Sequence, residues 1–118
     1  MAAMPLDRLT TDLRSAIDAI TLIDPHTHID PLRPASRTLD DILGYHYYTE
    51  LAHSAGMGKE PLAASVPARE RVRAILTHMP RYDNTAQYAW FIDICKTFLG
   101  YDGDQVSGAD ADRLFDAA

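Results

Sequence analysis

Apolar and polar positions follow a helical period over the first part of the chain. Between residues 5 and 20, apolar side chains recur every three or four positions and charged side chains fall between them; the apolar positions are Leu6, Leu9, Leu13, Ala16, Ile17 and Ile20. This spacing predicts an amphipathic helix. The apolar run over residues 21–24 is short and is stopped by Pro25, and it predicts a β-strand.

Helical patterns continue over the rest of the chain. Thr38 and Asp41 have the spacing of a capping box and predict a helix that ends near Gly56. Residues 65–67 open a further helix that Pro80 ends. In the next helix, we expect Asp83 or Asn84 as the N-cap, Gly100 as the C-terminal cap, and an inward stripe of Tyr88, Phe91, Ile94, Cys95 and Phe98. Ser107 and Asp110 start the final helix, which carries Leu114 and Phe115.

One strand among several helices poses a problem, because a lone strand leaves its backbone N–H and C=O groups without partners. Two explanations follow. Either the chain is all-helical and residues 21–24 are not a strand, or the strands that belong beside them are missing.

Two histidines follow this segment directly, in the order Asp24-Pro25-His26-Thr27-His28-Ile29-Asp30. On an extended backbone, residues i and i+2 point to the same side, so both imidazoles can reach one metal ion. Asp24 and Asp30 could orient the rings as hydrogen-bond acceptors, although aspartate is also common in turns for local reasons. The alternative is a pair of exposed loop histidines that hydrogen-bond to their neighbours.

Other titratable groups have weaker claims to chemistry. His46 lies in the aromatic run Gly44-Tyr45-His46-Tyr47-Tyr48, where an imidazole beside a phenol could transfer protons. Packing of these aromatic side chains against the fold is the competing interpretation. We expect His53 and His78 to be structural or exposed, and Cys95 to be a small buried hydrophobe.

Composition narrows the possible partners and compartments. The 118 residues carry 17 acidic and 11 basic side chains, so the formal charge of −6 argues against a nucleic-acid ligand. No apolar run approaches the roughly 18 residues that a membrane span needs. The single cysteine fits a reducing compartment, and we expect a cytoplasmic protein that does not bind membranes.

Together these motifs resemble the N-terminal part of the uronate (glucuronate) isomerase family, a branch of the amidohydrolase superfamily. The residues that carry the resemblance are the H-x-H of His26 and His28, the His-Tyr helix from Asp41 to Gly56, the helix with Asn84 and Trp90 that runs into Phe98-Leu99-Gly100, and the polar turn with a short helix from Val106 to Phe115. The likeness spans nearly the whole chain from Thr21 onward.

The resemblance implies an α/β fold, namely the N-terminal portion of a metal-dependent (β/α)₈ barrel. Residues 1–34 would hold the N-terminal helix, the first barrel strand and the metal-binding loop, and residues 35–118 would form a helical insertion. Such a barrel needs about 250 residues, so we expect the chain to be part of a longer enzyme and to be inactive as this piece alone.

The implied activity is the isomerisation of aldose uronates to ketose uronates, by ring opening and proton transfer between C2 and C1. The resemblance implies His26 and His28 as ligands of a divalent metal, with zinc the expected ion, and His46 and Tyr47 as catalytic residues that contact the sugar or relay protons. The partners would be a small sugar acid and either further copies of the chain or the remainder of the barrel.

Two alternatives remain open from the sequence. The first is a metal-dependent hydrolase or lyase of the same superfamily, in which activated water replaces proton transfer at the sugar. The second is a non-catalytic helical module that binds a partner through an exposed apolar face.

Overall fold

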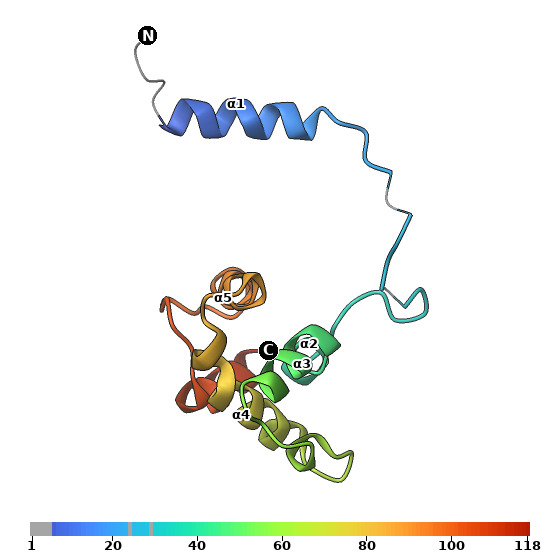
Figure 1. The fold of residues 1–118 in the computed structure, drawn as a ribbon, viewed down its shortest axis with the longest axis vertical. Coiled ribbons are helices and arrows are strands. Elements are labelled where there is room, and N and C mark those ends of the chain that lie inside the picture. The colour runs from blue at the N-terminus through green and yellow to red at the C-terminus, as the bar shows by residue number, and fades with distance from the viewer. Residues whose placement is uncertain (1–5, 24, 29) are drawn as a thin grey trace. The chain divides into compact units, whose positions relative to one another are not determined.

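The computed structural model describes residues 6–23, 25–28 and 30–118, and these divide into two compact units, residues 1–32 and 33–118 (Figure 1). Of these described residues, 61% are helical. Within the described ranges there is no β-strand, sheet or barrel, so the fold is all-α and the expected α/β class is wrong.

In the described part of the first unit there is one helix, α1, which spans Leu6–Asp18 as the periodicity predicts. None of its residues is buried, and Leu6, Leu13 and Ile17 are 77%, 54% and 60% exposed. The predicted strand is wrong for residues 21–23, which adopt no regular structure, and Asp24 lies outside the described residues. The physical reason is that no strand among the described residues pairs with the backbone of residues 21–23, and the side chains of Leu22 and Ile23 are exposed.

The second unit is a helical domain built around one central helix (Figure 1). Its α-helices are α2 (Leu39–Leu43), α3 (His46–Ser54), α4 (Ala68–His78), α5 (Ala86–Phe98) and α6 (Ala111–Ala117), and the 3₁₀-helices are η1 (Glu60–Leu62), η2 (Met79–Tyr82) and η3 (Gly108–Asp110). Helix α4 contacts α2, α3 and α6 as well as all three 3₁₀-helices.

Local capping explains where several of these helices begin and end. The Thr38 hydroxyl accepts a hydrogen bond from the Asp41 N–H at 3.1 Å, which caps α2 as predicted. The predicted single helix over residues 38–56 is instead two, because Gly44 ends α2 and Tyr45 is extended before α3. Gly100, with φ +62°, follows α5 in the left-handed conformation expected of a C-terminal cap.

Helix α4 ends at His78, with Met79 as its C-cap, so Pro80 follows its end as predicted and lies within the 3₁₀-helix η2. Two other expectations need correction. The N-cap of α5 is Thr85, whose hydroxyl accepts from the Tyr88 N–H at 3.3 Å, and not Asp83 or Asn84. Phe98, which was expected to face inward, is 75% exposed. The buried residues of α5 are Tyr88, Phe91, Ile92 and Cys95.

The core of the second unit is continuous and apolar. Its fully buried large side chains are Leu39, Leu43, Val72, Ile75, Leu76, Met79, Phe91, Val106 and Leu114. Cys95 is buried as predicted, and this burial raises the pKa of its thiol to about 12. A neutral thiol behaves here as a small hydrophobe.

Candidate functional site

The two predicted metal ligands lie side by side in the first unit. Nε2 of His26 and Nε2 of His28 are 2.9 Å apart, and the two rings meet edge to face with centroids 4.6 Å apart. The i, i+2 spacing on a non-helical backbone brings both imidazoles to one side, as the sequence argument requires. Both side chains are exposed, so a hydrated ion could approach them.

The spacing of these nitrogens can be compared with the geometry of a metal site. For metal–nitrogen bonds of about 2.0–2.1 Å, nitrogens 2.9 Å apart subtend an angle of about 90° at the ion, and a tetrahedral ion needs about 3.3 Å. The distance between the two nitrogens therefore matches an edge of an octahedral ion, and a tetrahedral ion would need the nitrogens slightly further apart. The same distance also fits a hydrogen bond in which one ring donates Nε2–H and the other accepts.

Two imidazoles do not complete a metal site. Among the described residues, no group of three or more His, Cys, Asp or Glu side chains is placed to hold an ion. Asp30 Oδ1 accepts a hydrogen bond from the Leu32 N–H at 2.9 Å, so this carboxylate stabilises a local turn. Asp24, the other predicted acceptor for an imidazole, lies outside the described residues.

The predicted catalytic residues His46 and Tyr47 belong to the second unit, at the start of α3. Together with Tyr45 they form an aromatic cluster, in which the His46 ring centroid lies 4.3 Å from the centroids of both Tyr45 and Tyr47. Tyr47 is 39% exposed, so its ring is accessible to a solute. Desolvation, followed by the neighbouring Tyr47 phenol, raises the pKa of Tyr45. The cluster can stack on a sugar face or transfer a proton through His46.

The other histidines have the structural roles expected of them. Nδ1 of His53 lies 2.9 Å from the Met57 carbonyl oxygen and ties α3 to the turn that follows it. Nδ1 of His78 lies 2.8 Å from the Ala74 carbonyl oxygen within α4. Because carbonyl oxygens accept these bonds, each ring presents its Nδ1–H to the backbone.

Comparison with known proteins does not assign the chain to a family. The chain matches no protein-family model, and no curated protein matches it. No helix in the described part of the chain has both the length and the apolar character to cross a membrane.

Proposed function

We propose that this chain contributes His26 and His28 as metal ligands to a metal-dependent aldose–ketose isomerase that acts on uronates. The observation that carries the proposal is the convergence of the two Nε2 atoms at 2.9 Å. The resemblance of the His26-Thr27-His28 and His46-Tyr47 motifs to the uronate isomerases supplies the reaction class.

In this proposal, each part of the chain has a stated role. A bound divalent cation would stabilise the negative charge that develops on the sugar when the C2 proton leaves. His26 and His28 would hold that cation through their Nε2 atoms, and its remaining coordination positions would need further ligands. For His46 and Tyr47, the resemblance to the uronate isomerases implies contact with the sugar and transfer of the proton from C2 to C1.

The first test measures the metal site by itself. Equilibrium dialysis against Zn²⁺ should give about one bound ion per chain, and replacing both His26 and His28 by Ala should weaken binding at least tenfold. His53→Ala is the matched control, because its imidazole is engaged by the Met57 carbonyl and should not contribute to zinc binding. Equal zinc binding by all three proteins would contradict the assigned ligands.

The second test measures the reaction. The protein as its gene encodes it is incubated with zinc and a panel of uronates in deuterated water, and proton NMR follows deuterium incorporation at C2. Exchange that the His26→Ala and His28→Ala substitutions abolish supports an isomerase. Zinc binding without exchange on any uronate would remove the isomerase and favour the hydrolase or lyase alternative.

One observation favours a second candidate, a helical module that binds a partner. Helix α1 exposes an apolar stripe that includes Leu9 and Leu13, and such a stripe normally packs against another surface. This candidate predicts that partner binding is lost in Leu9→Asp, Leu13→Asp variants and is unchanged when His26 and His28 are both Ala. The opposite pattern would reject it.

A further inference from the structure

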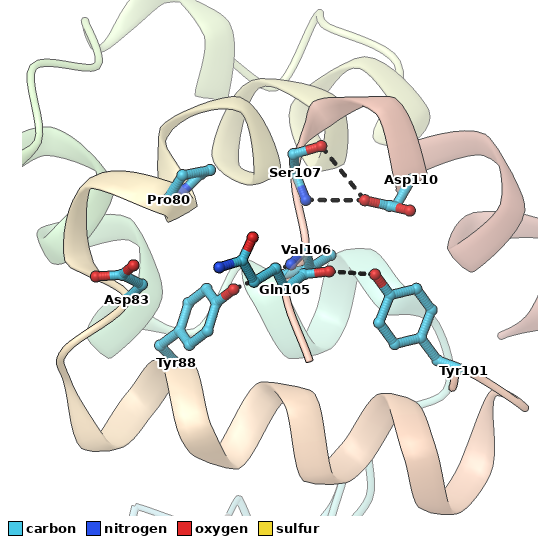
Figure 2. A pocket seen from close by; sticks show the side chains of 8 residues that line it. All are labelled: Pro80, Asp83, Tyr88, Tyr101, Gln105, Val106, Ser107 and Asp110. Atoms are coloured by element: carbon cyan, nitrogen blue, oxygen red, sulfur yellow. Dashed lines mark hydrogen bonds between the residues drawn. The ribbon is translucent and has the colours of Figure 1, made fainter. Parts of the chain in front are cut away.

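The second unit contains a cavity of about 330 Å³ to which the proposed isomerase site gives no role (Figure 2). It lies between α5, η2, η3 and the segment that precedes η3. Its lining residues are Pro80, Asp83, Tyr88, Tyr101, Gln105, Val106, Ser107 and Asp110. Its volume is at the lower end of the range for small-molecule sites in proteins, roughly 300–1,000 Å³.

Part of this lining is fixed by hydrogen bonds within the protein. The Tyr101 hydroxyl donates to the Gln105 carbonyl, and Asp110 Oδ2 accepts from the N–H and the hydroxyl of Ser107 at 2.9 and 3.3 Å (Figure 2). The Tyr88 hydroxyl accepts from the Val106 N–H at 3.0 Å. These bonds hold the 105–110 segment in place, so the cavity walls are formed before any ligand arrives.

Other groups at the cavity retain hydrogen-bonding capacity. The side chain of Tyr88 is only 6% exposed, and no acceptor for its hydroxyl proton is found within the described residues. The Asp83 carboxylate and the Gln105 side-chain amide lie on the exposed rim of the cavity, and neither makes a hydrogen bond or an ion pair to any described residue. In Figure 2 the Gln105 amide extends toward the side of the cavity where Asp83 and Tyr88 lie.

The charge of the lining selects the class of ligand. Two carboxylates, Asp83 and Asp110, line the cavity, and none of the described lining residues is basic. Arg113 is nearby, with its guanidinium 5.2 Å from the Tyr101 ring centroid, but it donates to the Gly100 carbonyl at 3.2 Å and pairs with Asp102. An anion would meet uncompensated carboxylates here, whereas an ammonium group would pair with Asp83.

We propose that this cavity binds a small primary amine that also carries a hydrogen-bond acceptor. The ammonium group donates hydrogen bonds to the Asp83 carboxylate and the Gln105 amide oxygen. The acceptor on the ligand accepts a hydrogen bond from the Tyr88 hydroxyl. Tyr88 thereby gains the acceptor that none of the described residues provides, which is the reason to expect a ligand with both features.

The proposal is tested with ethanolamine, which has an ammonium group and a hydroxyl. Ethylene glycol is the neutral control and glycolate the anionic control, and amide chemical shifts of ¹⁵N-labelled full-length protein report binding at Gln105, Val106 and Ser107. We expect saturable shifts at these amides with ethanolamine and at least tenfold weaker effects with the two controls. Equal responses to ethylene glycol, tighter binding of glycolate, or shifts confined to other residues would overturn the proposal.

Matched variants separate the site from general charge attraction. Asp83→Asn should weaken ethanolamine binding at least fivefold, whereas Asp93→Asn, which removes the same charge from an exposed position on α5, should leave it unchanged. Gln105→Ala provides a second probe should Asp83→Asn alter the fold, and it should also weaken binding. Two results would show that these residues do not form the site. One is an equal loss of ethanolamine affinity in the Asp83 and Asp93 variants, and the other is unchanged affinity in both the Asp83 and the Gln105 variants.

Discussion

The two units of the chain carry similar hydrophobic periodicity but differ in what that periodicity achieves. Helix α1 in the first unit has a continuous apolar stripe and buries none of it, whereas every buried residue of the described chain lies in the second unit. A helical pattern therefore predicts the helix but not its packing, since burial needs a second surface. The difference also separates the candidate sites: no core packing fixes the histidine pair, while the cavity is built on a packed domain.

The largest expected loss of stability comes from substitutions in the core of the second unit. Phe91 is fully buried and its ring lies 5.9 Å from the Tyr48 ring, so Phe91→Ala should lower the free energy of unfolding by about 3–5 kcal/mol. Leu13→Ala, in the exposed stripe of α1, should change it by less than about 0.5 kcal/mol. Urea titration followed by fluorescence of Trp90, the single tryptophan, reports on the second unit. Similar losses in both variants would mean that α1 is part of the same cooperative unit.

An intermediate loss of stability is expected on breaking an ion pair that links α2 to α4. The Arg71 guanidinium donates to both carboxylate oxygens of Asp40 and to the Val66 carbonyl, and Asp40 hydrogen bonding raises the pKa of Arg71. Because both side chains are less than a quarter exposed, Arg71→Ala should cost about 1–3 kcal/mol of stability.

A pair in α1 provides the comparison for Arg71. Arg8 Nε lies 3.7 Å from Asp12 Oδ2, and both side chains are largely exposed. Arg8→Ala should therefore leave the midpoint of urea unfolding unchanged. A loss in Arg8→Ala comparable to that in Arg71→Ala would contradict the view that burial makes the difference between these two pairs.

The accuracy of the sequence-based predictions follows the range of the interactions involved. The capping pairs Thr38–Asp41 and Ser107–Asp110 were predicted correctly, because each depends on residues three positions apart. Residues 21–23 were predicted wrongly, because a short apolar run becomes a strand only when a partner strand lies beside it. The exposure of Phe98 was not predicted for a related reason. Helical spacing shows which residues share a face of α5, but it does not show how much of that face the rest of the domain covers.

For the candidate sites too, prediction from sequence succeeds where the residues are close together in the chain. His26 and His28 can be recognised from sequence because they are two residues apart, and the structure places their nitrogens together. The cavity residues Asp83, Tyr88 and Gln105 come from separate segments, and only packing of α5 against the 105–110 segment brings them to one place. In the sequence Asp83 has the appearance of a helix cap, and nothing local signals its position at a cavity.

The smallest expected effect is the pH dependence of the α2 N-terminus. Asp41 Oδ2 accepts a hydrogen bond from the Arg37 N–H at 3.0 Å, and this bond is the main reason that the pKa of Asp41 is lowered in the folded state. Desolvation opposes the shift, and the hydrogen bond with Thr38 and the charge of Arg33 add to it. A carboxylate that binds protons less readily when folded stabilises the fold above its ordinary pKa of 3.8, and this contribution is lost as the pH falls through the lowered value.

Asp41→Asn should therefore flatten the acid limb of a plot of melting temperature against pH below about pH 4, with a loss of about 0.5 kcal/mol at pH 7. Asp12→Asn removes the same charge from α1, which has no buried residue, and should leave the acid limb of the Trp90-detected transition as it is. Parallel acid limbs in the wild type and in Asp41→Asn would show that the α2 cap does not couple protonation to folding. A flattened limb in Asp12→Asn would instead show that the ionisation of α1 affects the stability of the second unit, and that the two units are linked energetically.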